Sequence, residues 1–273
     1  MMKTIDQFDI RGRSAIVTGA ASGIGLAYTE AMAESGATVT LTDIDEEGLQ
    51  REAERLAGLG YQVRTAVLDV TDLDATRSVF EEHAAACGGL DIAFANAGID
   101  PGAGFWNPEG HRNEDGQIDT LDPARWQRTI DINLTGVFNT IREAARQMKP
   151  ARKGSIIATS SNAALINEAI IGVAYMPAKA GVAHLVRHVA LELAEYRIRV
   201  NAIAPGAFVT NIGGGWLKDP VVREAWDAGV PLGRIAETDQ IKPLALYLAS
   251  DASSYMTGSQ VVIDGGTMLG TFS

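Results

Sequence analysis

A tyrosine and a lysine stand four positions apart in Tyr175-Met176-Pro177-Ala178-Lys179, where they could carry out proton transfer. Residues i and i+4 share one face of a helix, so a helix here places the phenol beside the ammonium. A phenol has a pKa near 10 in water, and a neighbouring cation favours the phenolate. Lowering that pKa by about two to three units requires roughly 3–4 kcal/mol, which Lys179 and a second positive charge beside the phenol could supply together. The pair alone is not specific, because this spacing is common.

Two serines, Ser160 and Ser161, precede this pair and follow an expected strand at residues 155–158. A hydroxyl at a strand end can donate a hydrogen bond to a substrate oxygen and orient it for proton transfer. A lone serine at a strand end is more often only a turn former. The serines therefore gain meaning only together with Tyr175 and Lys179.

A glycine-rich segment, Thr18 to Gly25, could hold phosphate groups. It lies between an expected strand and an expected helix, where a dinucleotide pyrophosphate can meet a helix N-terminus. Gly19 allows a tight turn, Gly23 lets the backbone approach the pyrophosphate, and Gly25 lets the helix pack close to the strand. Without a ligand, the segment would be only a glycine-rich turn. Further contacts to a dinucleotide are expected from Ser22 and Ile24.

An acid, Asp43, follows the second expected strand, 24 positions after Gly19. A carboxylate there can accept hydrogen bonds from both ribose hydroxyls of an adenosine, and it repels a 2′-phosphate, so it favours NAD over NADP. The alternative is a solvated acid at a strand end. No Arg or Lys lies nearby to neutralise a 2′-phosphate, since Asp45 and two glutamates follow. Other residues expected at the same edge of the sheet are Ile44, Asp69, Val70, Asn96, Ala97 and Gly98.

Seven short apolar runs alternate with helix-length segments along the chain. Several runs are continuously apolar, as in strands buried on both faces, and the alternation implies right-handed crossovers. We therefore expect one α/β domain over residues 1–273, with a doubly wound parallel sheet of about seven strands and helices on both faces. Gly36 is expected to end the first helix. The expected strands are 15–18, 38–41, 63–68, 92–95, 155–158, 198–203 and 260–263, and the expected helices include 24–35, 46–59 and 72–87.

One long loop, residues 98–122, interrupts this alternation. It is rich in glycine and proline and carries the aromatic pair Phe105-Trp106. Loops of this length without periodicity are usually functional. We expect it either to close over the substrate as a lid or to pack statically, for example against another subunit.

The composition excludes several classes of protein. With 46% hydrophobic and 21% charged residues among 273, the chain is globular, and its net charge of −11 argues against a nucleic-acid partner. Neither a membrane span nor a signal peptide is expected, since the apolar runs are short and the N-terminus is polar. The single Cys87 excludes an intrachain disulfide and suits the cytoplasm. His184 and His188 have a zinc-like spacing but no third ligand, so no metal site is expected.

In their order along the chain, these motifs resemble the short-chain dehydrogenase/reductase family, in its NAD-type branch. The resemblance covers the chain from about Ile10 to Gly266. It implies a Rossmann-type fold, a nicotinamide cofactor and commonly a homotetramer. The matching residues are Thr18-Gly19-x-x-x-Gly23-x-Gly25, Asn96-Ala97-Gly98, Asn133, Ser161, Tyr175-x-x-x-Lys179 and Pro205-Gly206.

The resemblance also implies a role for each matching residue. Tyr175 resembles the general acid/base, Lys179 the residue that lowers its pKa and holds the nicotinamide ribose, and Ser161 the donor to the substrate oxygen. Asn133 resembles the helix residue that anchors a water linking Lys179 to solvent. The resemblance places Asp69 and Val70 beside the adenine, Asn96 to Gly98 beside the adenosine ribose, and Pro205, Gly206, Val209 and Thr210 around the nicotinamide.

The sequence departs from the family pattern in three places. The fourth-strand motif has Ala95 where a second asparagine is usual. The interval from Ser161 to Tyr175 is 14 residues, one longer than usual, so Ser160 remains an alternative donor. The loop 98–122 is longer than usual and neighbours the catalytic edge.

Together these features predict an NAD(H)-dependent oxidoreductase that interconverts a secondary alcohol and a ketone, with an apolar or cyclic substrate. One alternative is a 3-oxoacyl-type reductase using NADPH, which Asp43 opposes. Another is a dinucleotide-sensing protein without turnover, which the full catalytic set opposes. No Arg or Lys is expected beside the substrate, residues 207–230 are expected to form a substrate-side lid, and Trp126 and Trp226 are expected to pack. Substrate contacts are expected from Phe105, Trp106, Asn162, Ala207 and Trp216.

Overall fold

The computed structural model describes residues 3–107 and 110–270, apart from the side chains of Gly213 and Trp216. Its centre is one fully parallel sheet with the strand order β3-β2-β1-β4-β5-β6-β7. All seven strands predicted from the apolar runs are present. They are β1 (Ser14–Thr18), β2 (Thr38–Asp43), β3 (Val63–Val67), β4 (Ile92–Ala95), β5 (Gly154–Thr159), β6 (Ile198–Pro205) and β7 (Gln260–Ile263).

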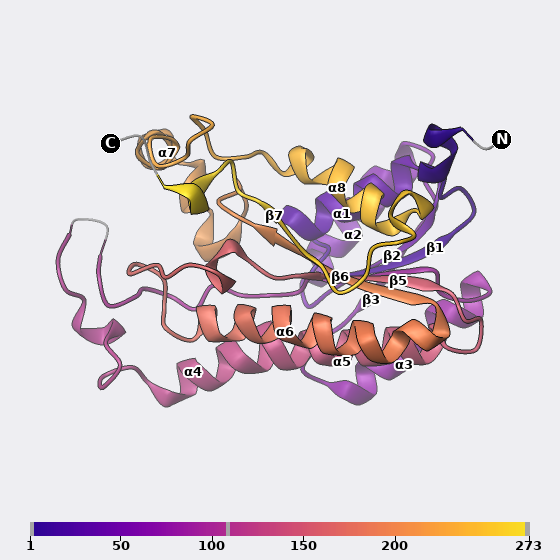
Figure 1. Ribbon diagram of the computed structural model, residues 1–273, viewed down its shortest axis with the longest axis horizontal. Helices are drawn as coiled ribbons and strands as arrows, with labels where there is room; N and C mark the ends of the chain where they lie inside the picture. Colours follow the sequence, from indigo (N-terminus) through magenta and orange to yellow (C-terminus); the bar gives the residue numbers. More distant parts are fainter. Residues whose placement is uncertain (1–2, 108–109, 271–273) are drawn as a thin grey trace.

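Helices cover both faces of this sheet, which makes three layers (Figure 1). Alternate residues of β1 explain the layers: Ala15 and Val17 pack into one apolar core, and Ile16 packs into the other. The first core is closed by α1 (Gly23–Glu34), α2 (Glu46–Gly58) and α8 (Lys242–Ala249). The second is closed by α3 (Leu73–Cys87), α5 (Gly136–Met148) and α6 (Tyr175–Leu193).

The helix ends follow local sequence signals. The side chain of Asp45 caps α2 by accepting from the Gly48 N–H at 3.0 Å, and Asp72 caps α3 in the same way. After α1, Gly36 has φ +85° and lies inside paired hydrogen bonds, Gly36 N–H to Ala33 and Ala37 N–H to Met32. Only glycine adopts this conformation without strain, which confirms its predicted role as the residue that ends α1.

The strand order reverses around β1, which pairs with β2 on one side and with β4 on the other. The connection after β1 leads to β2 on one side, and the connection after β3 leads to β4 on the other side. In an open parallel sheet such a reversal opens a crevice beyond the carboxyl ends of β1 and β4. The segments after β1, β2, β4 and β5 all emerge at this edge. The shorter helices α4 (Pro123–Ile130) and α7 (Pro220–Asp227) also lie at this end of the molecule (Figure 1).

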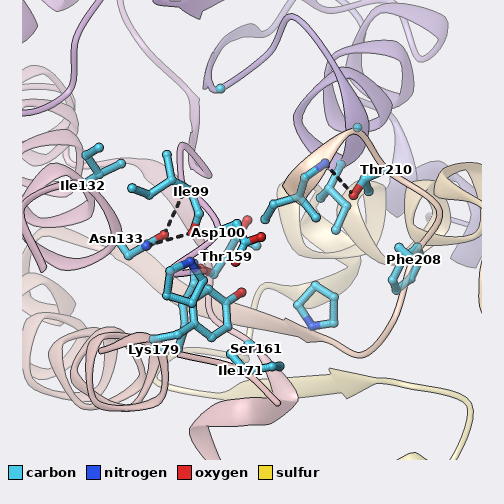
Figure 2. A pocket seen from close by; sticks show the side chains of 18 of the residues that line it. Ile99, Asp100, Ile132, Asn133, Thr159, Ser161, Ile171, Lys179, Phe208 and Thr210 are labelled. Atoms are coloured by element: carbon cyan, nitrogen blue, oxygen red, sulfur yellow. Dashed lines mark hydrogen bonds between the residues drawn. The ribbon is translucent and has the colours of Figure 1, made fainter. Parts of the chain in front are cut away.

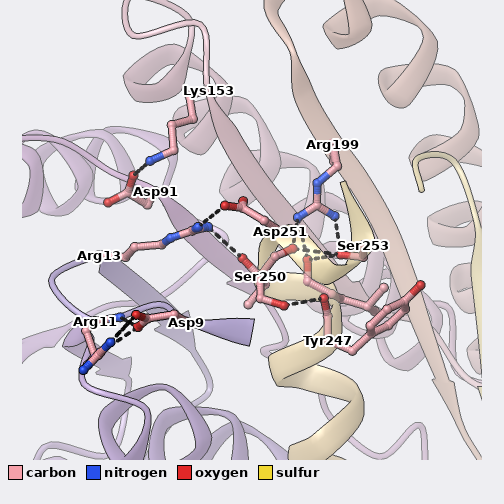
Figure 3. Close-up of polar contacts among 12 residues, drawn as sticks. Asp9, Arg11, Arg13, Asp91, Lys153, Arg199, Tyr247, Ser250, Asp251 and Ser253 are labelled. Carbon is pink, nitrogen blue, oxygen red and sulfur yellow. Dashed lines mark hydrogen bonds and ion pairs between the residues drawn. The ribbon is translucent and has the colours of Figure 1, made fainter. Parts of the chain in front are cut away.

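The opposite edge of the sheet is held by a network of charged groups (Figure 3). Arg13 pairs with Asp251 at 2.7 Å, and Lys153 pairs with Asp91 at 3.0 Å. Arg199 donates to the carbonyls of Leu248 and Ser250 at 2.9 and 3.0 Å. These arginines use their donors to tie the last helix to the sheet, so the network is structural.

The loop 98–122 is anchored by backbone hydrogen bonds to the segment that precedes Tyr175. The Gly104 N–H donates to Ile170 at 2.9 Å, and the Trp106 N–H donates to Ala169 at 3.1 Å. The side chain of Arg125, on α4, adds two bonds to the loop, to the carbonyl oxygens of Pro101 at 2.9 Å and Ala103 at 2.7 Å. The described part of the loop is therefore pinned along its first half.

The segment 207–230 forms two 3-10 turns and the helix α7. Leu217 and Val230 from this segment pack with Ile235 in a small cluster separate from the two main cores. Because these residues form their own cluster, the segment 207–230 packs beside the crevice and not into either core of the sheet. Whether it moves as a lid stays a prediction. In the described part of the chain, no helix is long and apolar enough to cross a membrane.

Candidate active site

A cavity of about 1490 Å³ opens at the carboxyl edge of the sheet and gathers most of the predicted site residues. Phe105 and Val209 are not among its described lining residues, and the side chain of Trp216 lies outside the described part of the structure. The predicted residues that line it are Gly19, Ser22, Gly23, Ile24, Gly25, Asp43, Ile44, Asp69, Val70, Asn96, Ala97, Gly98, Trp106, Asn133, Ser161, Asn162, Tyr175, Lys179, Pro205, Gly206, Ala207 and Thr210, together with the alternative donor Ser160.

The glycine turn after β1 is shaped by close packing. A Cβ on Gly25 would lie 1.9 Å from the Gly19 carbonyl oxygen, and a Cβ on Gly19 would lie 2.8 Å from the Ala97 Cα. Gly23 is different, because a Cβ there would meet only Thr210, at 3.4 Å. The first two glycines thus bring the N-terminus of α1 against the sheet, and the third leaves backbone open to the cavity. An open helix N-terminus of this kind can hold a phosphate.

Asn96 fixes this turn to the neighbouring strands. Its side-chain amide donates to the carbonyl oxygens of Thr18 at 3.0 Å and Gly19 at 3.2 Å, and its side-chain oxygen accepts from the Thr159 hydroxyl at 2.9 Å. One side chain therefore joins the ends of β1, β4 and β5. Because these bonds use both amide hydrogens, Asn96 shapes the cofactor end of the cavity through the backbone around it.

Asp43 ends β2 at the rim of the same cavity. Its carboxylate accepts from the backbone N–H groups of Ala21 at 3.0 Å and Asp45 at 3.1 Å. A carboxylate oxygen has more than one acceptor site, so each oxygen can still accept a hydroxyl from a ligand. The two backbone bonds hold the carboxylate in place for that contact.

Tyr175 and Lys179 lie on the first turn of α6 and face the cavity together. The Lys179 ammonium is 5.5 Å from the centre of the Tyr175 ring and donates to the Thr159 carbonyl oxygen at 2.9 Å. The lysine side chain is buried, and burial lowers its pKa to about 8. Figure 2 shows Lys179, Thr159 and Ser161 close together on one side of the cavity, with Phe208 and Thr210 on the other side.

The chain's own groups raise the pKa of Tyr175, and the expected lowering of this pKa by Lys179 stays a prediction. Burial raises the pKa of the Tyr175 phenol to about 12, a hydrogen bond with Ser161 opposes this rise, and the negative charge of Asp100 adds to it. The ammonium is directed to the Thr159 carbonyl, so desolvation of the phenolate is the larger effect. A lower pKa therefore requires positive charge from a bound ligand.

The two serines have different surroundings. The Ser161 hydroxyl donates to the Asn162 side-chain oxygen at 3.3 Å, accepts from the Ala163 N–H at 3.1 Å, and lies close enough to the Tyr175 phenol to lower its pKa. The Ser160 hydroxyl donates to the Lys179 backbone carbonyl at 3.0 Å and accepts from Gln260 at 3.2 Å. The geometry thus brings Ser161 to the phenol and leaves Ser160 bonded to the helix backbone.

Asn133 lies where α4 passes into α5 through a π turn, Asp131–Thr135. Its buried side chain exchanges two hydrogen bonds with the backbone of Ile99, each 3.1 Å long (Figure 2). Extra turns of this type are frequent at functional sites. Both side-chain groups of Asn133 therefore hold the start of the loop 98–122.

Several lining residues were not predicted. Arg128 lies on the cavity face of α4, so the expectation that no Arg or Lys lines the substrate end needs correction. The spacing of Ala124, Arg128 and Asp131 would have predicted one helix face, but nothing in it showed that this face meets the cavity. Trp226 packs as expected and also lines the cavity. Other residues in this group are Glu168, Ile170 and Ile171.

No group of three or more His, Cys, Asp or Glu side chains among the described residues is placed to hold a metal ion. The side chains described at this edge supply a phenol, a hydroxyl and an ammonium beside the glycine turn. These groups can orient an oxygen and move a proton.

Comparison with protein families and curated relatives gives consistent matches. The family model described as enoyl-(acyl carrier protein) reductase matches residues 19–268. The chain is 39% identical over 254 residues to a cis-4-hydroxycyclohexanecarboxylate dehydrogenase of Sinomonas cyclohexanicum, covering 93% of this chain and 96% of the relative. It is 35% identical to a 3-oxoacyl-[acyl-carrier-protein] reductase of Thermotoga maritima, covering 95% and 99%.

Among solved structures, a short-chain type dehydrogenase/reductase from Mycobacterium marinum superposes with a TM-score of 0.86 and 37% identity. The match covers 97% of this chain and 99% of that one. Similarity therefore extends over the whole sheet, the cavity and the loops around it.

Proposed function

The chain belongs to the short-chain dehydrogenase/reductase family, and from this premise we propose that it is an NAD(H)-dependent enzyme interconverting a secondary alcohol and a ketone. Membership of the family supports an oxidoreductase acting with a nicotinamide dinucleotide. The choice of NAD and of an apolar or cyclic alcohol is our inference from the residues of the cavity.

One observation carries the proposal: Ser161, Tyr175 and the buried Lys179 line the same cavity, and Ser161 is close enough to the Tyr175 phenol to influence its pKa. A hydroxyl and a phenol placed in this way can both reach one substrate oxygen. A protein that only senses a dinucleotide has no use for this arrangement. The arrangement therefore supports turnover over sensing.

The residues at the other end of the cavity fit a dinucleotide. The backbone at Gly23 is open beside Thr210, so the N-terminus of α1 can receive a pyrophosphate. Asp43 can accept the ribose hydroxyls of an adenosine and repels a 2′-phosphate, which supports NAD. When bound, the nicotinamide gives or accepts the hydride. The remaining residues proposed to contact it are Gly19, Ser22, Ile24, Gly25, Ile44, Asp69, Val70, Asn96, Ala97, Gly98, Pro205, Gly206, Val209 and Thr210.

In the oxidation direction, Ser161 donates a hydrogen bond to the substrate oxygen and Tyr175 removes the hydroxyl proton. In the reduction direction, Tyr175 returns that proton to the oxygen. Lys179 keeps a positive charge near the phenolate and donates to the backbone carbonyl of Thr159. At the same cavity, Asn133 donates to the backbone carbonyl of Ile99. We propose that Lys179 also holds the nicotinamide ribose.

The experiment is a spectrophotometric assay at 340 nm with a panel of secondary alcohols and either NAD or NADP. We expect reduction of NAD, with a preference over NADP. In Asp43→Ala, NAD should bind about 10- to 150-fold more weakly, the value of a hydrogen bond to a charged group, and the preference should narrow. Asp45→Ala serves as a control for the loss of one acid nearby. A wild-type preference for NADP would contradict the proposed role of Asp43.

A 3-oxoacyl reductase is the second candidate, because the matching family model and one relative carry acyl-carrier-protein names. That activity predicts rapid NADPH-dependent reduction of a 3-oxoacyl thioester. Asp43 disfavours NADPH, so we expect little turnover with this pair. An acetoacetyl thioester, tested with each cofactor in the same assay, separates the two candidates.

We further propose a homotetramer, on the family resemblance, and a reducing compartment such as the cytoplasm. The second proposal rests on the single Cys87. Neither depends on the identity of the substrate.

A further inference from the structure

Glu168 is one of the residues that line the substrate half of the cavity. It lies between the Ser161 turn and α6, and its backbone N–H contacts the Met176 sulfur at 3.4 Å, next to Tyr175. Glu168, Ile170 and Ile171 line the cavity together with Tyr175. The proposed mechanism gives this carboxylate no task.

The Glu168 carboxylate has no hydrogen-bond or ion-pair partner recorded within residues 3–107 and 110–270. The nearby cations are engaged elsewhere: Arg125 donates to the carbonyls of Pro101 and Ala103, and Lys179 donates to Thr159. Arg128 is exposed on α4 and forms no recorded ion pair with it. Partial burial raises the pKa of the Glu168 carboxyl, which shows that surrounding protein replaces part of its water.

A second carboxylate strengthens the negative potential here. Asp100 lines the same cavity, and its charge acts on the Tyr175 phenol. Asp100 is exposed and accepts from the Gly102 N–H at 2.8 Å, so it is fixed in place but well solvated. Glu168 and Asp100 set two negative charges against the one exposed positive charge of Arg128, so the net charge of these three side chains favours a substrate with a positive charge.

The other lining groups are mostly apolar and include two tryptophans, Trp106 and Trp226. An apolar ring suits these walls, and aromatic side chains also attract cations to their faces. A polyol would leave many hydroxyls without partners against Ile170, Ile171 and the tryptophans. Apolar walls suit the ring of a substrate, and the unpaired acid suits a positively charged substituent on that ring.

We propose that Glu168 is a specificity-determining residue that selects a cyclic secondary alcohol or ketone carrying a protonated amine away from the carbinol carbon. The inference rests on the proposed alcohol–ketone chemistry. Glu168 would then be the counter-ion for the protonated amine of the substrate, and it would disfavour compounds that carry an anionic group on the same ring.

Four probes with a six-membered ring test it, each with a different group opposite the carbinol. They are 1-methylpiperidin-4-ol, a cation at neutral pH; cyclohexane-1,4-diol, a neutral donor; 4-methylcyclohexanol, which is apolar; and 4-hydroxycyclohexanecarboxylate, an anion. In the wild type with NAD, we expect kcat/KM to be at least 10-fold higher for the cation than for the methyl compound and lowest for the anion. The diol separates charge from simple hydrogen bonding.

Glu168→Gln keeps the size of the side chain and removes its charge. In this variant the ratio of kcat/KM between cation and methyl compound should fall by about 10-fold or more, mainly through KM, and the anion should improve. Glu168→Asp should restore part of the ratio. Glu114→Gln, an exposed acid on the loop that does not line the cavity, removes the same charge and should leave the ratio unchanged.

Titration calorimetry of the same compounds into the protein with NADH gives a readout independent of turnover, and the same cation preference should appear in the dissociation constants. If Glu168→Gln leaves both ratios within twofold, or if the wild type prefers the anion, the inference is wrong. If no probe is oxidised with either cofactor but the cation still binds through Glu168, the proposed function fails and the binding role stands.

Discussion

At the scale of single residues, the environment of Tyr175 determines how the proton is moved. Its phenol is raised to a pKa of about 12 by burial, so at neutral pH it is protonated and suited to donate to a ketone. For oxidation, it must lose this proton, and the Lys179 charge alone does not achieve that. The positive ring of an oxidised nicotinamide is the charge that remains available, which links the protonation of Tyr175 to the cofactor.

Removal of the phenol oxygen is the most direct test of this role. Tyr175→Phe keeps the ring and deletes the proton carrier, so turnover should fall by about 10² to 10⁴ in both directions. The dissociation constant for NAD, measured by calorimetry, should change little. Tyr196→Phe, far from the cavity on the 3-10 turn after α6, is a matched control. Oxidation rates close to wild type in Tyr175→Phe would place the base on another residue.

The buried charge of Lys179 serves the proposed function but lowers the stability of the folded protein. Burial lowers its pKa from the ordinary lysine value of 10.5 to about 8, and each pKa unit corresponds to 1.36 kcal/mol, so the buried charge costs about 3 kcal/mol at pH 7. Below pH 8 the lysine is protonated in both the folded and unfolded states, and the full cost applies. Between pH 8 and 10.5 the unfolded lysine holds its proton more tightly, so wild-type stability rises with pH relative to a variant without the charge.

Lys179→Met should therefore be inactive but more stable than the wild type at pH 7, by about 1 to 2 kcal/mol once the lost hydrogen bond to Thr159 is subtracted. Urea denaturation at pH 7 and at pH 9.5 measures this. The stability advantage of the variant should shrink at pH 9.5, because the buried lysine of the wild type has then lost most of its proton and its charge. Titration of Tyr175 does not affect the comparison, since both proteins contain it. A variant that is less stable at pH 7, or equally advantaged at both pH values, would contradict the cost assigned to the buried ammonium.

Most of the residues that line the candidate site could be predicted from sequence, but the contacts between them could not. The number of residues between the serines and Tyr175 left both Ser160 and Ser161 possible as the donor to the substrate oxygen. Spacing along a loop does not show which of two neighbouring side chains points to the cavity. In the structure Ser160 bonds to Lys179 backbone and to Gln260, a residue 100 positions away in sequence. Glu168 carries no motif at all, so only its place in the cavity identifies it.

At the scale of elements, the long loop is a wall with defined attachments. Its backbone pairs with Ala169 to Gly172, the segment that carries the side of the cavity next to Tyr175. Arg125 holds two of its carbonyl oxygens from the other side. These bonds favour the static alternative for the first half of the loop over a freely moving lid.

Replacing Arg125 should weaken the attachment of the loop 98–122 and leave the cofactor end of the cavity unchanged. In Arg125→Met, KM for the alcohol should rise by about 10-fold, a change of about 1.4 kcal/mol, while the NAD dissociation constant stays within twofold. Amide hydrogen exchange at Gly104, Trp106 and Gly172 should become faster. Arg112→Met, on the same loop but bonded to Gln117, is the control. Unchanged exchange at these amides would show that the pairing holds without the clamp.

The strands and the first three helices could be predicted because their signals are local: apolar runs, caps and Gly36. The attachment of the loop could not, since it depends on pairing between Gly104 and Ile170, which are distant in sequence. For the same reason, nothing in the sequence showed that α4 turns the face with Arg128 to the cavity.

At the scale of the whole molecule, the net charge of −11 influences assembly. We expect four copies of the 28.9 kDa chain to associate, so like charges must approach one another. At about 0.01 M salt the screening length is near 30 Å and repulsion acts across the interfaces, whereas at about 0.15 M it is near 8 Å. Light scattering should therefore give a tetramer mass at physiological salt and partial dissociation at low salt. A monomer mass at both salt concentrations would contradict the assembly.

The central position of β1 has a consequence for the way the protein is made. A ribosome releases the chain from its N-terminus, and early segments begin to fold before later ones exist. Strands β1 to β3 can pair as soon as they emerge, but the other side of β1 waits for β4, which begins at Ile92. Until then, the apolar edge at Ile16 and Val17 is unpaired, and such an edge invites pairing with other chains. Synthesis that stalls before Ile92 therefore leaves a nascent chain that depends on a chaperone, and one that stalls after β4 has emerged does not expose this edge.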